Sequence, residues 1–339
     1  MPHTVTLLPG QQQFPSDPEE TLLDAALRHG VTLPYGCRNG ACGACKGKVL
    51  QGTVDHGQAN NHALSTAERA DGMTLFCCAQ ARSDLVIECR EVSGKDLRTK
   101  TLPARVQRMT RASADVMILH LQLPASERLQ FLAGQYIDIL LKDGRQRSFS
   151  LANAPHDDAV LELHVRHVPG GIFTDHVFTA MKERDILRLK GPLGTFYLRE
   201  DSARPLVLIA GGTGFAPVKG LVEHAIHHGI TRPINLYWGA RTRNGLYMAE
   251  LATRWAAEHP HIRFVPVLSE PTPADAWTGR TGLVHRAVLE DFDDLAGHQV
   301  YACGAPAMVD AARQDCTTLR NLPLNEFFAD AFSFANDTP

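Results

Sequence analysis

The spacing of apolar and polar residues near the N-terminus predicts a small mixed domain. Residues 4–8 alternate between polar and apolar, as a half-buried strand does, and residues 46–50 and 84–88 are also predicted as strands. Between them, apolar residues recur at helical spacing, at Leu22, Leu23, Ala26 and Leu27, and end before Gly30. Asp17, Pro18 and Glu20 offer this helix an N-cap, a first-turn proline and a carboxylate. These elements fit a β-grasp domain over residues 1–92.

The middle of the chain shows a different pattern. Residues 93–100 are mostly polar and are predicted to be a linker. Short strand-like segments then recur, at residues 104–109, 115–122, 135–141, 146–151 and 160–167. Regularly spaced short strands separated by turns predict an antiparallel β-barrel over residues 101–200.

The last third alternates between apolar runs and helical patterns. Residues 206–210 form a continuous apolar run, which is typical of a buried parallel strand. A glycine-rich loop and a helical pattern that ends near Gly229 follow it. Further strand-and-loop units are predicted at residues 234–238, 264–268 and 300–302. This alternation predicts a doubly wound parallel sheet over residues 201–339.

Composition and charge exclude several classes of protein. The chain has 339 residues, of which 44% are hydrophobic and 21% charged, so it is neither disordered nor fibrous. A net charge of -3 argues against nucleic acid as the main partner. No apolar run approaches the roughly 18 residues of a membrane span, and the first residues do not resemble a signal peptide. We therefore expect a cytoplasmic protein.

Five of the eight cysteines lie in one short stretch of the chain. Cys37, Cys42, Cys45 and Cys77 match the C-x4-C-x2-C…C spacing of plant-type [2Fe–2S] ferredoxins. The intervening glycines, Gly36, Gly40 and Gly43, would let the backbone curl and direct N–H groups at the sulfurs. The alternatives are a zinc site and a set of buried free thiols; zinc usually takes paired C-x2-C hooks or histidines. Cys78 competes with Cys77 as the fourth ligand.

Two segments of the predicted barrel point to a flavin. Residues Arg147, Ser148, Phe149 and Ser150 resemble the Arg-x-Tyr-Ser signature of the ferredoxin–NADP reductase superfamily. The resemblance implies that Arg147 binds a flavin phosphate, that Phe149 lies along the flavin in place of Tyr, and that Ser150 reaches its reactive edge. Downstream, Arg166 precedes a Gly170-Gly171 turn that runs into a helix, where we expect free N–H groups to bind a pyrophosphate and Thr174 to add a hydroxyl.

The loop after the first buried strand of the last third predicts a nicotinamide site. A glycine-rich loop between a buried strand and a helix is a phosphate cradle. This one departs from G-x-G-x-x-G because Pro217 replaces the third glycine, and it resembles instead the superfamily's Gly-Gly-Thr-Gly-x-Ala-Pro loop. The matching residues are Gly211, Gly212, Thr213, Gly214, Ala216 and Pro217.

The resemblance also assigns residues near the reacting rings. Cys303 and Gly304, at the end of a later strand, match the superfamily residues beside the nicotinamide; taken alone, Cys303 would be read as a small buried hydrophobe. A C-terminal aromatic covers the flavin in the oxygenase-reductase branch, which implies Phe332 with Phe328 as the alternative, and core packing is the other explanation for both. Residues 75–79 match the family's Leu-x-Cys-x-Ala, which favours Cys77 over Cys78.

The choice between NADH and NADPH rests on two arginines. Arg241 and Arg243 follow the second strand of the predicted parallel sheet. An arginine at this place suits the 2′-phosphate of NADP, whereas a carboxylate suits the 2′-hydroxyl of NAD. The most similar family members are mostly NADH-linked and tolerate arginine here, so we expect NADH and keep NADPH as the alternative.

Taken as a whole, the chain is similar to single-chain iron–sulfur flavoprotein reductases. The resemblance is strongest to the CDP-6-deoxy-delta-3,4-glucoseen reductases of dideoxysugar synthesis and to reductase components of bacterial oxygenases. It implies hydride transfer from NAD(P)H to FAD, with Ser150, Cys303 and Phe332 at the reacting rings, and then single electrons passing through a [2Fe–2S] cluster to a partner protein. That partner would be an iron–sulfur dehydrase or an oxygenase component. A cofactor-binding redox sensor is a remote alternative, and we expect a monomer.

Overall fold

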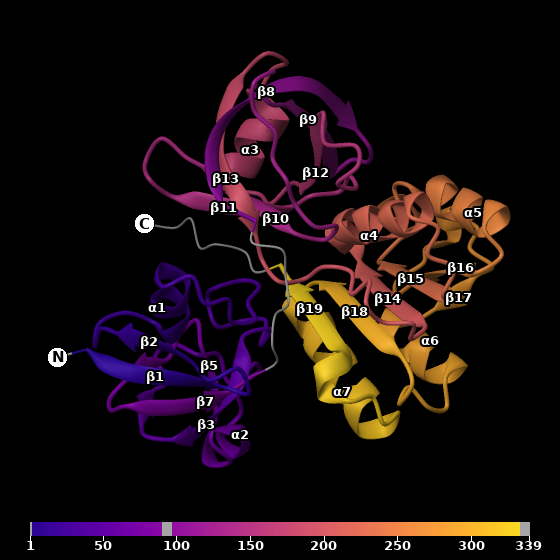
Figure 1. The fold of residues 1–339 in the computed structure, drawn as a ribbon. Helices are drawn as coiled ribbons and strands as arrows, with labels where there is room; N and C mark the ends of the chain where they lie inside the picture. Colours follow the sequence, from indigo (N-terminus) through magenta and orange to yellow (C-terminus); the bar gives the residue numbers. More distant parts are fainter. Residues whose placement is uncertain (1, 90–96, 333–339) are drawn as a thin grey trace. The chain divides into compact units, whose positions relative to one another are not determined.

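A mixed five-stranded sheet forms the N-terminal part of the computed structural model, which describes residues 2–89 and 97–332 (Figure 1). The sheet has the strand order β2-β1-β7-β3-β5. Its strands are β1 (His3–Leu8), β2 (Gln12–Ser16), β3 (Lys46–Gln51), β5 (Met73–Leu75) and β7 (Leu85–Glu88). β1 is antiparallel to β2 and parallel to β7. The small strands β4 (Val54–Asp55) and β6 (Gln80–Ala81) form a separate pair, and the helices are α1 (Leu22–Arg28) and α2 (Thr66–Ala70).

The helix α1 begins later than the sequence analysis predicts. Its N-cap is Thr21, whose hydroxyl accepts a hydrogen bond from the Asp24 amide at 3.1 Å. The expected cap, Asp17, instead belongs to a turn in which its amide donates to Glu20 Oε1 at 2.8 Å. The prediction was wrong because Thr21 can receive the orphan amide of the third helical residue, and it stands immediately before the buried Leu22 and Leu23.

Six strands of the second part form an antiparallel barrel, as predicted. They follow the order β11-β10-β13-β8-β9-β12. A bridge between Leu151 and Leu163 joins the two edges of this sheet. The strands are β8 (Lys100–Arg111), β9 (Val116–Gln122), β10 (Tyr136–Leu140), β11 (Gln146–Ser150), β12 (Val160–Arg166) and β13 (Ile186–Leu193). The helix α3 (Ile172–Thr179) packs Phe173 and Val177 into the barrel core (Figure 1).

The predicted linker lies partly outside the described residues. Residues 93–96 belong to the portion that the structure does not describe, and β8 already begins at Lys100. By spatial clustering, the described residues divide into one unit with residues 2–89, 194–196 and 329–332, and another with residues 97–193 and 197–328. The second unit therefore contains the barrel and most of the sheet that follows, whose last strand is divided between the two units.

The last third forms the expected parallel sheet, in the order β17-β16-β15-β14-β18-β19. Its strands are β14 (Leu206–Gly211), β15 (Ile234–Ala240), β16 (Ile262–Leu268), β17 (Arg280–Thr281), β18 (Gln299–Gly304) and β19 (Phe327–Ala331). The helices are α4 (Phe215–His227), α5 (Ala249–Glu258), α6 (Val284–Asp291) and α7 (Pro306–Leu319), with short 3-10 turns at Gly212–Gly214, Arg243–Gly245, Pro273–Asp275 and Leu324–Glu326. The helices α4 and α5 cover one face, and α6 and α7 the other (Figure 1).

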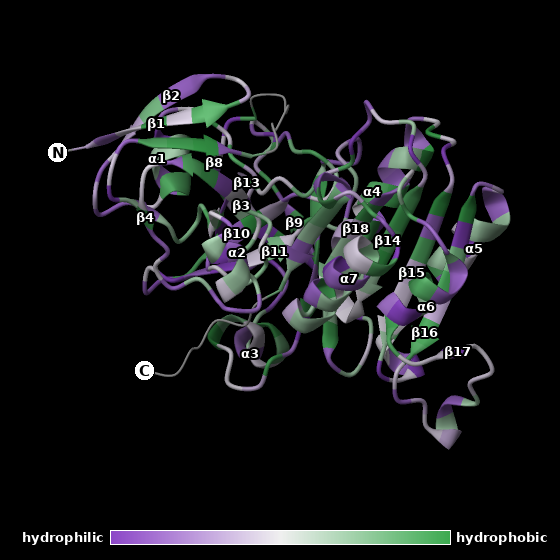
Figure 2. Ribbon diagram, turned by 90° about the horizontal axis from the view of Figure 1, so that it is seen from below, coloured by the Kyte–Doolittle hydropathy of each residue, from purple (hydrophilic) through white to green (hydrophobic). Residues whose placement is uncertain are grey.

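The order of the strands on either side of β14 indicates where a ligand would bind. The chain moves from β14 outward through β15 and β16, then returns to place β18 on the other side of β14. The strand order thus reverses between β14 and β18, and sheets of this kind bind ligands at that crevice, beyond the carboxyl ends of the strands. Figure 2 shows the apolar character of β14, whose first five residues are all buried.

Candidate functional site

The four predicted cluster ligands form two close pairs in the N-terminal unit, Cys37 with Cys42 and Cys45 with Cys77. Cys37, Cys42 and Cys45 lie in the loop between α1 and β3, and Cys77 follows β5. The Sγ atoms of Cys45 and Cys77 are 3.2 Å apart. The amides of Cys37 and Cys42 each donate to the other's sulfur, at 3.4 and 3.3 Å, and the Ala44 amide donates to Cys42 Sγ at 3.4 Å. These N–H···S bonds are the kind that tune an iron–sulfur cluster.

The pKa values of these cysteines favour one thiolate and oppose the formation of further ones. A hydrogen bond from Cys42, with further bonds from backbone amides, lowers the pKa of Cys37 to about 6. Hydrogen bonding to Cys37 and burial raise the pKa of Cys42, while hydrogen bonding to Cys45 and the nearby Cys37 charge raise that of Cys77. Four thiolates at this spacing therefore need a bound cation, which the irons of a cluster supply. The residues present fit a [2Fe–2S] group.

Glycines shape this loop at positions where a side chain would be strained or crowded. Gly40 and Gly43 have φ values of +75° and +65°, which favour glycine. A Cβ on Gly36 would lie 3.2 Å from Cys42 Sγ. These backbone conformations let the loop curl, as the spacing of the glycines predicts.

The flavin motif occupies β11, an edge of the barrel sheet next to β10. Ser150 is buried and pairs with Tyr136 across the two strands. The Phe149 ring lies 5.2 Å from that of Phe173 on α3, at 51°. The hydroxyl of the exposed Ser148 donates to Asp138 at 2.6 Å. Partial burial, with repulsion from Arg145, lowers the pKa of Arg147, so a bound anion would stabilise its charge.

The Gly-Gly turn differs from its prediction in one respect. Its two amides are engaged inside the loop, since Gly171 N–H donates to the Val168 carbonyl at 2.9 Å and Gly170 N–H donates to Asp175 Oδ2 at 3.0 Å. The Thr174 hydroxyl likewise donates to the Val168 carbonyl, at 2.9 Å. The expectation of free glycine amides was wrong because Asp175 and the Val168 carbonyl already receive them. The loop instead fixes the start of α3.

Arg166 connects the barrel to the nicotinamide loop. Its Nε donates to Asp115 Oδ2 at 3.1 Å, which orients the guanidinium. A Cβ placed on Gly212 would lie 2.9 Å from Arg166 Nη1, so the guanidinium rests against the glycine backbone. Gly212 also has a φ of +53°. The structure thus brings a predicted flavin residue and a predicted nicotinamide residue into contact.

The loop after β14 is packed tightly against the end of β18. A Cβ on Gly214 would lie 2.1 Å from the Cys303 carbonyl oxygen, so no larger residue fits there. Thr213, Ala216 and the Cys303 side chain are buried. Gly304 has a φ of +145°, and a Cβ on it would lie 3.0 Å from the Gly211 carbonyl oxygen. The glycines of both strands therefore meet at the crevice where the strand order reverses.

Trp238 is a residue of this site that the sequence analysis missed. Its indole Nε1 donates to the Gly212 carbonyl at 2.9 Å. Its ring stacks on Phe215 at the start of α4, with centroids 3.8 Å apart. A buried tryptophan needs a partner for its N–H, so a tryptophan at the end of an apolar strand was the available signal. Trp238 holds the loop that would receive the nucleotide.

A buried chain of polar side chains also links the barrel to α4, and it too was missed. Lys219 Nζ, on α4, lies 3.3 Å from Glu162 Oε2 and 2.9 Å from Glu223 Oε2. Glu162 Oε1 lies 2.7 Å from His164 Nε2, and His164 Nδ1 lies 2.8 Å from the Tyr247 hydroxyl. Because a carboxylate only accepts, Nε2 carries the His164 proton and Nδ1 accepts from Tyr247.

Arg241 and Arg243 have different partners. Arg241 Nε and Nη2 lie 3.1 and 2.8 Å from Glu270 Oε2, at the ends of β15 and β16. The Glu270 amide donates to the Arg241 carbonyl at 2.9 Å, which keeps the two residues side by side. Arg243 Nη1 donates to the Asp275 carbonyl at 3.2 Å. The strand end therefore presents a carboxylate as well as an arginine.

The two C-terminal phenylalanines lie in different surroundings. Phe328, in β19, is buried and stacks on Tyr301 with centroids 4.4 Å apart. Phe332 follows β19 and is partly exposed. Phe328 therefore has the core role that was one explanation for both rings, while the assignment of Phe332 to the flavin stays a prediction.

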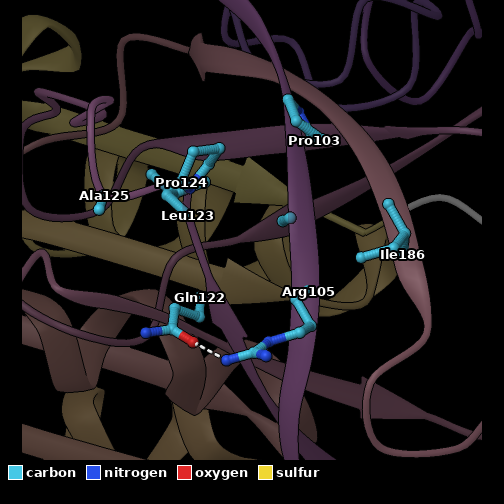
Figure 3. A pocket seen from close by; sticks show the side chains of 8 residues that line it. Pro103, Arg105, Gln122, Leu123, Pro124, Ala125 and Ile186 are labelled. Atoms are coloured by element: carbon cyan, nitrogen blue, oxygen red, sulfur yellow. Dashed lines mark hydrogen bonds between the residues drawn. The ribbon is translucent and has the colours of Figure 1, made fainter.

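A groove on the outside of the barrel involves none of the predicted site residues. It has a volume of about 350 Å³ and lies over β8, β9 and β13 (Figure 3). Pro103, Leu123, Pro124 and Ile186 make it largely apolar, and Arg105 donates to Gln122 at its edge.

Comparison with known proteins agrees with this geometry. Three family models match: a 2Fe-2S iron-sulfur cluster binding domain over residues 5–82, an oxidoreductase FAD-binding domain over 103–197 and an oxidoreductase NAD-binding domain over 208–314. The chain is 43% identical over 331 residues to a CDP-6-deoxy-L-threo-D-glycero-4-hexulose-3-dehydrase reductase of Yersinia pseudotuberculosis, covering 97% of this chain and 98% of the relative. The chain belongs to the family of single-chain iron–sulfur flavoprotein reductases.

Other members of this reductase family serve different named systems. Reductase component 1 of a Comamonas terephthalate 1,2-dioxygenase is 38% identical and is matched over 98% of both chains. The crystal structure of the Amycolatopsis cytochrome P450 reductase GcoB is 38% identical, with a TM-score of 0.76 over 97% of this chain and 98% of that one.

Membership in this family confirms several predictions. The chain is an oxidoreductase with domains for a [2Fe–2S] cluster, FAD and NAD, and the predicted fold classes are correct. In the portion of the chain that the structure describes, no helix is both long and apolar enough to cross a membrane.

Proposed function

We propose that Arg147, Arg166 and the β14 loop of this reductase arrange FAD and a nicotinamide dinucleotide for hydride transfer, and that Cys37, Cys42, Cys45 and Cys77 hold the cluster. The observation that carries this proposal is the contact between Arg166 and Gly212, because it joins the flavin barrel to the nicotinamide loop. When bound, FAD accepts two electrons as hydride and the [2Fe–2S] cluster passes electrons on one at a time.

Each residue has a physical role in this arrangement. The partly buried Arg147 guanidinium binds a flavin phosphate, and Phe149 offers an aromatic surface beside Phe173. Ser150 orients the reactive edge of the flavin. Residues 211–217 form the glycine-rich loop that receives the nicotinamide dinucleotide. Cys303 and Gly304 line the crevice beside this loop.

The electron acceptor is an iron–sulfur dehydrase that acts on a nucleotide-linked deoxyhexulose. The relative named for such a system shares 43% identity with this chain, against 38% for the terephthalate dioxygenase reductase. Both are matched along nearly their whole length. An oxygenase component is the second candidate acceptor. In either case the protein works as a cytoplasmic monomer that meets its partner transiently.

NADH is the preferred electron donor. Two guanidinium nitrogens of Arg241 donate to the Glu270 carboxylate. This carboxylate stands at the strand end where the ribose 2′-hydroxyl of NAD is usually recognised. A 2′-phosphate would have to displace this carboxylate and approach its negative charge.

Cofactor analysis and coupled turnover test the proposed function. The purified holoprotein should contain iron, acid-labile sulfide and FAD at about 2:2:1, and NADH should reduce cytochrome c through it. It should support turnover of a CDP-hexulose dehydrase better than that of a terephthalate dioxygenase. Iron without labile sulfide would contradict the cluster, and support of only the dioxygenase would favour the second acceptor. Cofactors at the expected ratio without cytochrome c reduction would favour a sensor.

A further inference from the structure

A fifth thiol touches the proposed cluster ligands. The Sγ atom of Cys78 lies 3.7 Å from that of Cys77, within the range of an S–H···S hydrogen bond. The Cys78 amide donates to the Leu75 carbonyl at 2.9 Å, which fixes the backbone turn that carries both cysteines. The Cys78 side chain is partly buried. Its thiol is thus held beside Cys77.

Cys78 packs closely against two glycines, at which a side chain would collide with it. A Cβ on Gly40 would lie 2.7 Å from Cys78 Sγ, and a Cβ on Gly57 would lie 2.5 Å from the Cys78 carbonyl oxygen. Both glycines have positive φ, at +75° and +54°. Gly40 belongs to the loop that carries Cys37, Cys42 and Cys45, so the fifth thiol packs directly against the ligand loop.

The direction of the hydrogen bond follows from the proposed function. Once Cys77 binds iron it is a thiolate without a proton, so only Cys78 can donate. A donor to a ligand sulfur withdraws electron density and stabilises the reduced cluster, which carries one more negative charge. We infer that Cys78 is a positioning residue for electron transfer: its thiol donates a hydrogen bond to the Cys77 sulfur and raises the cluster's reduction potential.

This tuning would act on the distribution of electrons between the two cofactors. A higher cluster potential draws electrons from the reduced flavin, and a lower one returns them. For a one-electron couple, each tenfold change in that equilibrium corresponds to about 59 mV. Cys78 therefore affects the fraction of the cluster that is reduced when the protein meets its electron acceptor.

The test is a redox titration of the full-length holoprotein, followed by the EPR signal of the reduced cluster. In the Cys78→Ala variant we expect full cluster content and a more negative midpoint potential. Cys78→Ser keeps a donor and should restore most of the shift. Cys89→Ala is the matched control, because Cys89 is a buried cysteine of the same unit outside the proposed ligand set, and its potential should equal that of the parent protein.

Three outcomes would overturn the inference. The first is a potential in Cys78→Ala equal to that in Cys89→Ala, with the cluster intact. The second is no recovery with serine. The third is loss of the cluster in Cys78→Ala, which would make Cys78 a ligand in place of Cys77. Failure of the proposed function itself is recognised separately, because the parent protein would then lack acid-labile sulfide.

Discussion

At the scale of single residues, the nicotinamide crevice depends on the absence of side chains. Gly214 lies so close to the Cys303 carbonyl that a methyl group has no space, and the Arg166 guanidinium rests against Gly212. The sequence predicted the glycine loop from its resemblance to a family, but it could not indicate that Trp238 holds the loop from a distant strand. Such contacts depend on tertiary packing, which a local pattern does not encode.

Replacement of Gly214 by alanine should separate the β14 loop from β18. Overpacking of this kind costs about 1–3 kcal/mol, and the displaced loop should weaken NADH binding by about tenfold. Titration of NADH against the oxidised holoprotein measures this loss. Gly297→Ala, where a Cβ would meet nothing within 4 Å, serves as the control and should bind NADH normally. Normal affinity in Gly214→Ala would contradict the assignment of this loop.

Glu270→Gln should shift the preference toward NADPH. The change removes a negative charge near the ribose and releases Arg241 for a phosphate, so kcat/KM for NADPH should rise roughly fivefold. The ratio of kcat/KM for the two nucleotides, measured with ferricyanide, tests this expectation. The control is Glu250→Gln, an exposed residue of α5. An unchanged ratio would exclude Glu270 as the determinant.

At the scale of elements, the periodicity of the sequence predicted most strands but few connections between them. The strands β1, β3, β9, β10, β11 and β14 lie within a residue or two of their expected positions. The pattern did not indicate β13 or α2, since exposed residues interrupt the former and the latter has no buried residue. Nor could it indicate that Lys219 of α4 reaches Glu162 of β12. A buried ion pair across two elements leaves no periodic signal.

This ion pair should make the second unit sensitive to acid. Burial opposes the Glu162 charge, but the hydrogen bond from His164 and the Lys219 charge outweigh it and lower the pKa of Glu162 to about 2. A depressed carboxyl pKa stabilises the folded state above the unfolded value of 4.5, and this contribution, about 3 kcal/mol, is lost as the pH falls toward 2.

Urea unfolding at pH 5 and pH 3.5 measures that dependence. All three tryptophans, Trp238, Trp255 and Trp277, lie in the second unit, so their fluorescence reports its unfolding. Stability should fall less between these pH values in Glu162→Gln than in the parent protein, while the exposed Glu258→Gln should behave like the parent. Equal losses in all three proteins would show that Glu162 does not carry the effect.

At the scale of the whole molecule, one chain combines a two-electron and a one-electron site. The glycine crevice and flavin motif lie in the second unit, and the four cysteines assigned to the cluster lie in the first. The motif order in the sequence predicted this division, and matches to the three domain models agree with it. The identity of the acceptor could not be predicted in this way, because relatives named for both kinds of system match this chain along nearly its whole length.

The central claim is that electrons pass from NADH through FAD to the cluster and only then to a protein acceptor. Anaerobic stopped-flow spectroscopy of Cys42→Ala tests it most directly. The variant loses one cluster ligand, so NADH should still bleach the flavin at a rate within about twofold of the parent, while cytochrome c reduction falls to background. Loss of flavin bleaching, or cytochrome c reduction that persists without the cluster, would contradict this order of transfer.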